Sequence, residues 1–478
     1  MVYDAIIVGA GPGGSSAATF LAQRGLSILL LDKADFPRDK VCGDGLTPQA
    51  IFWLDILGCV DEVLSQTNSC ITSADLYVNG EYLLTGRFPQ DTQYPGFCTL
   101  LERKKLDYVL VRNAVAHGAV FRPRHLVQKL FWLDDSIAVE AKLDKKAVRF
   151  EGKLLIGADG ANSVVSRSIG NAPRDGTTAI SLRTYYQGAQ VDMSPVKIYV
   201  SEQFFPGYGW VFVDDSGKAN IGIGYASDKN FPMKHNLKKT LNDFIQTDLK
   251  KMLRGATPIG QPAGWWACFF KPKSIVTDRV MLIGDAANLA DPMNGGGIHK
   301  AMESAYTASQ VAIWAIASGD CSQQTLSRYE KLWNERAELD WRTAELFLSI
   351  IKNPNLRELY LFLLKTLGRL TAEDQRFQDF CSGIFSGVTP QSAFLSPLVL
   401  FDVVPFDPGV LFSIFRTSNG VKSQSPLNLA TSAARNTLKM TGRVVTSPLK
   451  NLDWGVEIST KTLSLMECYL NKQITSIV

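Results

Sequence analysis

The chain has 478 residues, of which 46% are hydrophobic and 20% are charged, the composition of an ordinary globular protein with room for two or three domains. The balance of 50 Lys and Arg against 46 Asp and Glu leaves a net charge of +4, and no basic run interleaves with aromatic residues, so nucleic acid is not an expected partner. The 8 cysteines contain no C-x-x-C pair and only 4 histidines occur, so we expect no metal site and a reducing compartment.

The chain opens directly on an apolar strand, which is unlike a signal or transit peptide. No uninterrupted apolar stretch reaches the ~20 residues that a membrane-spanning helix needs. We therefore expect a cytoplasmic protein, with a peripheral membrane contact as the alternative.

The opening stretch, residues 1–33, predicts a strand, a phosphate-binding turn, a helix and a second strand. Residues 2–8 are rich in β-branched side chains and too few for a helix, which is typical of a buried parallel strand. Gly9, Gly11 and Gly14 follow at the spacing G-x-G-x-x-G, with Gly13 among them. Gly9 allows the tight turn, and Gly11 lets the backbone approach a pyrophosphate. Gly14 lets the helix pack close to the strand. The helix N-terminus then faces the phosphates.

The second strand of this unit, residues 26–31, is followed by Asp32. A carboxylate at this position holds both hydroxyls of an adenosine ribose and favours FAD or NAD over NADP. The sequence therefore predicts a dinucleotide site of the Rossmann type.

A segment with too much proline, glycine and charge for a regular element follows at residues 33–46, K-A-D-F-P-R-D-K-V-C-G-D-G-L. With the opening unit it resembles the FAD-dependent geranylgeranyl reductase family, a branch of the hydroxylase-type flavoprotein superfamily. The family pattern K-x-x-x-P-R-x-K-x-C-G-x-G-L is matched at Lys33, Pro37, Arg38, Lys40, Cys42, Gly43, Gly45 and Leu46. The resemblance implies that Lys33 and Arg38 contact the cofactor and that the turn of Cys42, Gly43 and Gly45 lies against the flavin.

Two further motifs are shared with the hydroxylase-type superfamily. The pattern R-x-x-L-D-x-x-L begins at Arg103, on an expected amphipathic helix, and D-G-x-x-S-x-x-R begins at Asp159. The resemblance implies that Arg103 contacts the cofactor and that the strand around Val127 passes beside the adenine. It also implies that Asp159 lies near the pyrophosphate and ribityl region, whereas Arg167 at the end of its motif has either a cofactor or a structural role.

The most specific motif is G-D-A-A-x-x-x-x-P-x-x-G-x-G-I, which starts at Gly284 and opens a long helix of small residues. Its residues Asp285, Pro292, Gly295, Gly297 and Ile298 are expected to contact the cofactor. Asp285 can accept a hydrogen bond from the ribityl chain, and the amides at the helix N-terminus can stabilise an electron-rich reduced ring. The neighbouring His299 is interpreted as a surface or capping histidine rather than as an acid or base.

Residues 176–275 change to aromatic, glycine-rich strands, and residues 71–87 read as a hairpin turning at Asn79-Gly80. The geranylgeranyl reductase family carries Y-x-W-x-F-P and then G-x-G, which line the tunnel for the prenyl chain. The residues that match are Tyr208, Trp210, Phe212, Gly222 and Gly224, while Val213 replaces the proline. Flavin halogenases place W-x-W-x-I-P nearby, and the single tryptophan argues against that branch. Without the resemblance, sheet core and substrate pocket are equally compatible with these aromatic residues.

We expect an α/β FAD-binding domain of the Rossmann, hydroxylase-like type, an antiparallel β-sheet substrate domain and a mostly helical C-terminal region. The FAD-binding domain is expected at residues 1–70, 98–175 and 276–340, and the substrate domain at 71–97 and 176–275. A helical pattern runs over residues 47 to about 65. The C-terminal region, 341–478, is interpreted as a helical tail packed on the two domains, with a lid or an interfacial membrane helix as the alternative.

The resemblance implies reduction of C=C bonds in a geranylgeranyl or polyprenyl group by hydride transfer from reduced flavin, with a prenylated small molecule or lipid as substrate. Cys42 is the candidate proton donor or gate. Only one dinucleotide unit is present, so electrons are expected from an external donor, either NAD(P)H or a ferredoxin-like protein. The alternatives are an FAD-dependent monooxygenase of the hydroxylase or halogenase kind and a non-catalytic prenyl-binding protein.

Overall fold

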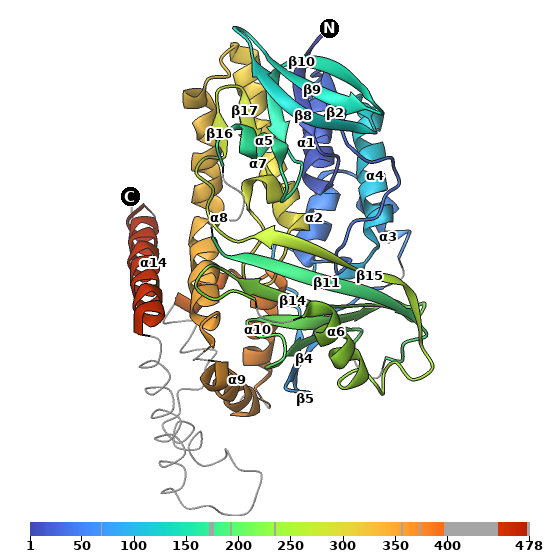
Figure 1. Cartoon of the computed structure of the whole chain (residues 1–478), viewed down its shortest axis with the longest axis vertical. Helices are drawn as coiled ribbons and strands as arrows, with labels where there is room; N and C mark the ends of the chain where they lie inside the picture. Colours follow the sequence, from blue (N-terminus) through green and yellow to red (C-terminus); the bar gives the residue numbers. More distant parts are fainter. Residues whose placement is uncertain are drawn as a thin grey trace, which may run out of the picture. The chain divides into compact units, whose positions relative to one another are not determined.

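The computed structural model describes residues 1–67, 69–171, 176–191, 194–233, 236–354, 357–370, 372, 374–395 and 448–475 (Figure 1). Its residue contacts divide the chain into two compact units. The first unit comprises residues 1–70, 98–179 and 264–338, and the second comprises residues 71–97, 180–263 and 339–478. The sequence also contains an apolar, proline-punctuated stretch at residues 394–415, which lies largely outside the described residues.

The first unit is built on a mostly parallel sheet in the order β16-β17-β10-β1-β2-β7, to which β8 and β9 are added beside β10. Its strands are β1 (Val2–Val8), β2 (Ile28–Leu31), β7 (Val120–Arg122), β8 (His125–Trp132), β9 (Ile137–Leu143), β10 (Lys146–Gly157), β16 (Val276–Thr277) and β17 (Val280–Leu282). A further two-stranded ladder joins β3 (Gly45–Leu46) to β6 (Thr99–Leu100). The parallel pairs of β1 with β2 and β10 confirm the predicted opening unit. The central strands are buried because helices cover the sheet.

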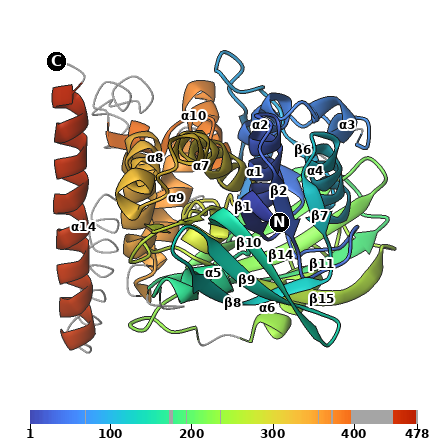
Figure 2. The ribbon, with the colours of Figure 1, turned by 90° about the horizontal axis from the view of Figure 1, so that it is seen from above.

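Three helices pack side by side in this unit, as Figure 2 shows. They are α1 (Pro12–Ala22), α4 (Arg103–Ala116) and α7 (Ile298–Ser318), with α1 in contact with both others. Every residue of α1 is buried, and a Cβ at Gly13 would lie 3.3 Å from the carbonyl oxygen of Ala301. The small residues of α1 therefore allow its close contact with α7.

The helical pattern predicted over residues 47–65 is present, divided into two helices. These are α2 (Pro48–Ile56) and α3 (Val60–Leu64). Gly58, between them, has a φ of +72°, which ends a helix because only glycine adopts this backbone at little cost. Thr47 caps α2 by accepting a hydrogen bond from the amide of Ala50.

The second unit is built on a sheet in the order β15-β11-β14-β13-β12-β4-β5. Its strands are β4 (Ser73–Val78), β5 (Glu81–Arg87), β11 (Thr178–Gln187), β12 (Val196–Val200), β13 (Gly207–Val213), β14 (Lys218–Ser227) and β15 (Thr257–Cys268). The hairpin of β4 and β5 is confirmed. The sheet is mixed rather than wholly antiparallel, because β4 pairs in parallel with β12. The chain enters the sheet twice, at 71–97 and after 176, and this sets the direction of β4.

The two faces of this sheet differ in what covers them. One face packs against α6 (Leu237–Gln246), and its core includes Leu182, Val211, Ile221 and Phe244 (Figure 1). Because successive side chains of a strand point to opposite faces, Tyr208, Trp210 and Phe212 of β13 lie on the other face. We call the face that carries these three aromatic residues the aromatic face.

Trp210 fixes the shape of the aromatic face. Its indole Nε1 donates to Oδ1 of Asn220 at 3.0 Å, and Gly222 is its cross-strand partner. A Cβ at Gly222 would lie 2.1 Å from the indole ring, so the ring occupies the space of the missing side chain. The ring of Tyr208 lies 6.2 Å from that of Trp210 and 5.7 Å from that of Phe385.

The C-terminal helices of the described residues are α8 (Gln323–Ile351), α9 (Arg357–Leu370), α10 (Gln375–Ser386) and α14 (Pro448–Thr475). The sequence predicts a helix break at Asn353-Pro354, and α8 ends just before it, at Ile351. In the second unit α10 packs on β5, where Oγ of Ser382 donates to the carbonyl of Gly86 at 3.1 Å. α14 lies beside α8 (Figure 2), and the indole of Trp454 donates to the carbonyl of Ser349 at 2.7 Å.

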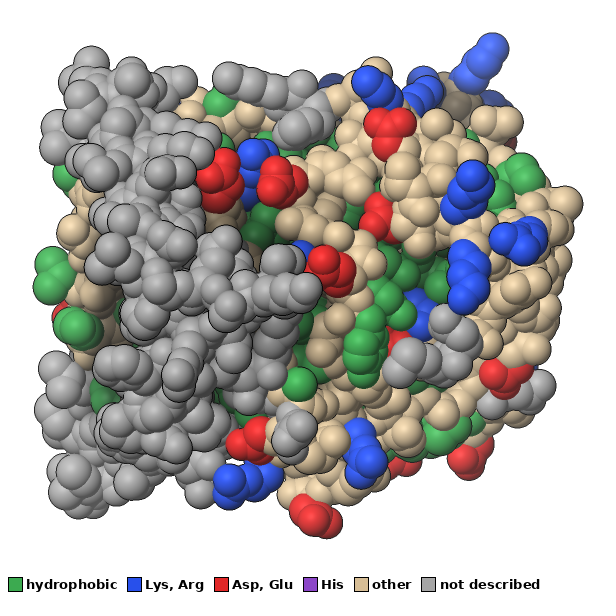
Figure 3. Space-filling view, turned by 90° about the horizontal axis from the view of Figure 1, so that it is seen from below, with side chains coloured by type: hydrophobic (Ala, Val, Ile, Leu, Met, Phe, Trp, Pro, Cys, Tyr) green, Lys and Arg blue, Asp and Glu red, His purple; other side chains and the backbone are tan. Residues whose placement is uncertain are grey.

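Charges of both signs are scattered over the described part of the face drawn in Figure 3, in keeping with the small net charge. Within the described residues, none of the helices has the length and apolar character needed to cross a membrane.

The contrast between Gly222 and Gly224 gives a test of the aromatic face. We expect Gly222→Ala to destabilise the protein by about 1–3 kcal/mol, because the new methyl group must displace an indole that is held by Asn220. A Cβ at Gly224 would lie 3.9 Å from the same indole, so Gly224→Ala is the matched control and should be neutral or slightly stabilising. Thermal unfolding and tryptophan emission measure both effects. Equal melting temperatures for the two variants would contradict this packing.

Candidate functional site

The glycine turn after β1 is shaped by close backbone contacts. A Cβ at Gly9, whose φ is +101°, would lie 2.3 Å from the carbonyl oxygen of Ala158, and a Cβ at Gly14 would lie 1.8 Å from the carbonyl oxygen of Gly9. The space beside Gly11 is different, because the nearest atoms are the guanidinium nitrogens of Arg38 and Arg103, at 3.8 and 4.0 Å. The turn therefore presents an open backbone position to two cations, which is the arrangement that a pyrophosphate requires.

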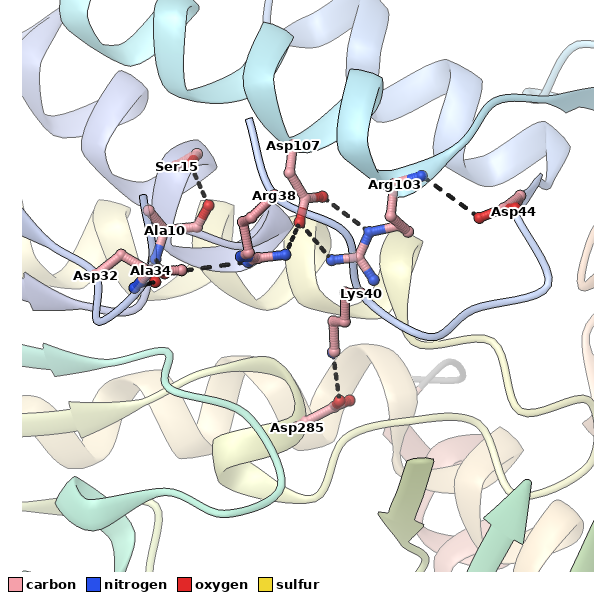
Figure 4. Close-up of polar contacts among 10 residues, drawn as sticks. All are labelled: Ala10, Ser15, Asp32, Ala34, Arg38, Lys40, Asp44, Arg103, Asp107 and Asp285. Atoms are coloured by element: carbon pink, nitrogen blue, oxygen red, sulfur yellow. Dashed lines mark hydrogen bonds and ion pairs between the residues drawn. The ribbon is translucent and has the colours of Figure 1, made fainter. Parts of the chain in front are cut away.

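Asp32 lies at the end of β2, as predicted, and is buried (Figure 4). Its Oδ2 accepts from the amide of Ala10 and its Oδ1 from the amide of Ala34, both at 2.8 Å. Each carboxylate oxygen keeps a second lone pair, so the group can still accept from ribose hydroxyls. Lys33, the next residue, is exposed.

A buried carboxylate joins the two arginines (Figure 4). Asp107 is fully buried, and its Oδ2 lies 2.7 Å from both Nη1 of Arg38 and Nη2 of Arg103. A second bond runs from Nε of Arg103 to Oδ1 at 2.8 Å. Burial alone would lower the pKa of Arg103, but Asp107 outweighs this and raises it above its ordinary value. Asp107 was not among the predicted site residues, although its i,i+4 spacing from Arg103 is a signal in the sequence.

The carboxylate of Asp44 holds the turn that carries Cys42. Asp44, not Gly43 or Gly45, has the left-handed backbone, with a φ of +62°. It is buried, and its Oδ1 accepts from the amide of Arg103 at 3.4 Å. Burial raises the pKa of the half-buried Cys42 thiol, and the nearby Arg103 offsets this only in part. The thiol therefore carries its proton at neutral pH.

The segment that leads into α7 carries five of the predicted cofactor residues, from Asp285 to Ile298. A Cβ at Gly297 would lie 3.3 Å from Oδ1 of Asp285, and Gly297 is the N-cap of α7, in which Ile298 is the first residue. Pro292 is buried, and Gly295 has a φ of +70° that a turn requires. Lys40 reaches the same loop, with its Nζ 3.5 Å from Oδ2 of Asp285 (Figure 4) and 5.0 Å from the ring of Trp265.

Of the two interpretations of His299, surface or capping, the structure excludes the surface position. It is almost completely buried in the first turn of α7, and its Nδ1 lies 3.4 Å from Oγ1 of Thr47. Burial, together with the charge of Lys300, lowers the pKa of His299 well below its ordinary value. The imidazole is therefore neutral and connects α7 to the cap of α2.

The contacts described for Asp159 and Val127 are with residues other than Arg38, Arg103 and Asp107. Asp159 caps α5 (Val164–Ser168), since its carboxylate accepts from Oγ of Ser163 at 2.5 Å and from the amide of Val164 at 2.6 Å. Val127 is buried in β8 and, with Arg167, lines a surface hollow of about 410 Å³. The hollow is of the size that binds small ligands. Arg167 itself donates to the carbonyl of Asn162 at 2.9 Å.

In the described residues, no group of His, Cys, Asp or Glu side chains has the arrangement of a metal site. The predicted substrate residues Tyr208, Trp210 and Phe212 share the aromatic face of the second unit. Gly222 and Gly224 lie within β14 on that same face, opposite Trp210 and Tyr208. The aromatic residues are therefore not part of the core that packs on α6.

Comparisons with known proteins agree with this site. The FAD binding domain family matches residues 2–345. The chain is 29% identical over 411 residues to the digeranylgeranylglycerophospholipid reductase of Methanosarcina acetivorans, which covers 80% of this chain and 93% of that protein. It is 31% identical over 354 residues to digeranylgeranylglycerophospholipid reductase 2 of Methanococcoides burtonii, with 69% of this chain and 80% of that protein covered.

Solved structures extend the likeness to the fold. A geranylgeranyl bacteriochlorophyll reductase-like protein of Thermoplasma acidophilum superposes with a TM-score of 0.71 at 27% identity, covering 84% of this chain and 98% of that one. A flavin-dependent brominase shares the fold with a TM-score of 0.65 at 20% identity, covering 84% and 99%. Because the family match spans most of the chain and the curated relatives are covered over most of their length, the protein belongs to the FAD-dependent oxidoreductases of the geranylgeranyl reductase family, with FAD as its cofactor.

Proposed function

We propose that this protein reduces C=C bonds of a geranylgeranyl or related polyprenyl group with electrons from FAD. The observation that carries the proposal is its likeness, over most of their length, to relatives named for reduction of digeranylgeranylglycerophospholipid. The glycine turn, Asp32, the two arginines and the N-terminus of α7 support it, because together they match the parts of an FAD.

In this proposal, different residues of the first unit bind different parts of FAD. Asp32 would hold the adenosine ribose, and the hollow beside Val127 has room for the adenine. The open backbone at Gly11, with Arg38 and Arg103, would hold the pyrophosphate. Asp285 would accept from the ribityl chain, and the amides of Gly297 and Ile298 would stabilise negative charge on the ring. When it is bound and reduced, FAD supplies the hydride for the alkene carbon.

Cys42 is suited to supply the proton. An isolated alkene is not polarised, so its second carbon needs a nearby acid while hydride is delivered to the first. The raised pKa of the Cys42 thiol keeps that proton in place at neutral pH. Gly13 would serve the cofactor through the close packing of α1 on α7. The other predicted residues would act through the shape and charge of their segments; they are Lys33, Gly43, Gly45, Asp159, Pro292 and Gly295.

The aromatic face of the second unit is suited to the prenyl chain. Tyr208, Trp210 and Phe212 present rings, and Gly222 and Gly224 leave the strand opposite them without side chains. A polyprenyl chain needs an apolar surface on which it can leave water, and these rings supply such a surface. We therefore propose residues 71–97 and 176–275 as the substrate domain, and residues 1–70, 98–175 and 276–340 as the FAD-binding domain.

Two partners belong to the same proposal. Gly222 and Gly224 lie inside β14 and form no phosphate-binding turn, so electrons would come from an external donor, either NAD(P)H or a ferredoxin-like protein.

A lipid substrate also favours contact with a membrane surface. The exposed side chains of Val456, Leu463 and Met466, which share one side of α14, support that contact.

The alternatives are less well supported. Hydroxylases and halogenases resemble this chain at no more than 20% identity among the structures compared, which is a likeness of fold alone. A non-catalytic prenyl-binding protein would not need a protonated thiol and two arginines beside a nucleotide turn.

An anaerobic assay of prenyl reduction tests the proposed function. Dithionite-reduced protein is mixed with geranylgeranyl diphosphate or a geranylgeranyl lipid, and flavin absorbance and product mass are followed together. We expect reoxidation of the flavin with a gain of two hydrogen atoms for each double bond reduced. A flavin that stays reduced until oxygen is admitted, and then gives an oxygenated product, would replace this function with the monooxygenase.

Removal of the Cys42 thiol tests the proton donor. We expect Cys42→Ala to lower the rate of prenyl reduction by about 10²-fold, the usual contribution of a general acid, with an unchanged FAD content. Cys70→Ala, at an exposed cysteine, is the matched control. Because the raised pKa keeps the thiol protonated, the wild-type rate should hold steady between pH ~6 and ~8. Undiminished reduction by Cys42→Ala would remove Cys42 from the mechanism.

The shared carboxylate is tested through cofactor affinity. We expect Asp107→Asn to weaken FAD binding by about tenfold to a hundredfold, because both arginines lose a charge-assisted hydrogen bond. Titration of the apoprotein with FAD, followed by flavin fluorescence, measures the dissociation constant. Glu62→Gln breaks the exposed pair with Arg112 and is the control, which should bind FAD as the wild type does. Wild-type affinity in Asp107→Asn would refute the role of the cluster.

A further inference from the structure

Lys40 joins the loop of residues 33–46 to the segment that leads into α7. Its Nζ lies 3.5 Å from Oδ2 of Asp285 (Figure 4), and only 25% of the Lys40 side chain and 18% of the Asp285 side chain are exposed. Among the residues that the structure describes, Asp285 is the only carboxylate within ion-pair distance of Lys40, and Lys40 is the only cation within that distance of Asp285. The two charges therefore offset each other.

Two further contacts fix this pair beside the start of α7. Nζ of Lys40 lies 5.0 Å from the centre of the Trp265 ring, within the range of a cation–π contact. The other oxygen of Asp285, Oδ1, is the atom that a Cβ at Gly297 would approach to 3.3 Å, and Gly297 is the N-cap of α7. The carboxylate therefore has Lys40 at one oxygen and the first turn of α7 at the other.

The charges in this place act in opposite directions on a ring that gains electrons. Reduction of FAD by two electrons and one proton leaves one negative charge on its ring. The N-terminus of α7 favours that charge, since its amides and the helix dipole are positive, whereas the carboxylate of Asp285 disfavours it. The ammonium of Lys40 offsets the carboxylate, and a partly buried pair is screened by salt less than a pair in open water.

We propose that Lys40 is a positioning residue for the redox step, which neutralises Asp285 beside the N-terminus of α7 and so favours the reduced state of bound FAD. This rests on the proposed function, in which Asp285 accepts from the ribityl chain and the amides at the start of α7 face the ring. It adds a cation from the loop that carries Cys42. The same loop then supplies the proton and sets how readily the flavin accepts electrons from its external donor.

Four single variants separate the charge of Lys40 from its packing. Lys40→Met removes the ammonium and keeps most of the side-chain length, whereas Lys40→Arg keeps the charge. Asp285→Asn removes the opposing charge. Lys331→Met, at an exposed lysine of α8 in the same unit, is the matched control for net charge.

The reduction potential of bound FAD is measured without air, by equilibrium of each holoprotein with a reference dye during stepwise reduction with dithionite. We expect Lys40→Met to weaken the preference for the reduced state by about tenfold, which lowers the two-electron potential by about 30 mV. Asp285→Asn should raise the potential by a similar amount, because it removes a negative charge. Lys40→Arg and Lys331→Met should keep the wild-type potential.

The opposite signs distinguish a charge from a purely structural role. We expect the double variant of Lys40→Met and Asp285→Asn to have a potential between those of the two single variants, since the site again has no unpaired charge. An unchanged potential in Lys40→Met, a shift of the same sign in Lys40→Met and Asp285→Asn, or an equal shift in Lys331→Met would overturn the proposal. If Lys40→Met does not retain FAD, Lys40→Gln, which can still donate to Asp285, supplies the same test.

The measurement does not depend on the prenyl substrate. Should the wild type reduce no prenyl compound, the proposed function fails, and the potentials still decide the role of Lys40. An unshifted potential in Lys40→Met, in a protein whose wild type does reduce prenyl compounds, would overturn the role of Lys40 alone.

Discussion

The cofactor site depends on one buried carboxylate that serves two arginines. Asp107 is fully buried on α4, and it receives Arg103 from its own helix and Arg38 from the loop after β2. A lone carboxylate in such a place would be expensive, and so would either arginine without it. The guanidinium nitrogens of both arginines then lie nearest to Gly11, the one glycine of the turn with open space beside it. The need to satisfy Asp107 therefore fixes where the loop of residues 33–46 lies.

The loop of residues 33–46 also carries Cys42, the proposed proton donor. Asp44 binds the amide of Arg103, so the same helix start that supplies Arg103 also sets the turn that carries Cys42. Lys40 from the same loop reaches Asp285 beside the N-terminus of α7. Three segments far apart in the sequence are thus joined by charge, and the position of the thiol is coupled to the position of the pyrophosphate contacts.

Sequence reasoning reached the parts of this site that depend on local backbone. Gly9, Gly14 and Gly297 are positions where a side chain would collide with a neighbour or a helix must begin, and a motif records such constraints. It failed where contacts between distant segments decide. Nothing in the sequence around His299 indicates that Thr47 and the start of α2 bury it. The parallel pairing of β4 with β12 likewise depends on how the chain enters the sheet twice.

The aromatic face shows how a pattern can be visible and still be ambiguous. The alternation around Trp210 predicts a strand, and either face of that strand could have been the core. The partners decide: Val211 meets Phe244 and its neighbours in the core on α6, whereas Trp210 meets Gly222 and Asn220. The same alternation in S-L-R-T-Y-Y-Q places Arg183 and Tyr185 on the face of β11 that does not carry Leu182. This assignment can be made only when the core face is known.

Each unit therefore holds its cations in a different way, and the difference has a chemical consequence. In the first unit Arg38 and Arg103 are oriented by a carboxylate and stand beside a glycine turn, so an anion there also receives backbone amides. In the second unit Arg183 on β11 and Lys218 on β14 both lie against the aromatic ring of Tyr185. The first arrangement suits a dinucleotide, whose phosphates lie mid-molecule between polar groups.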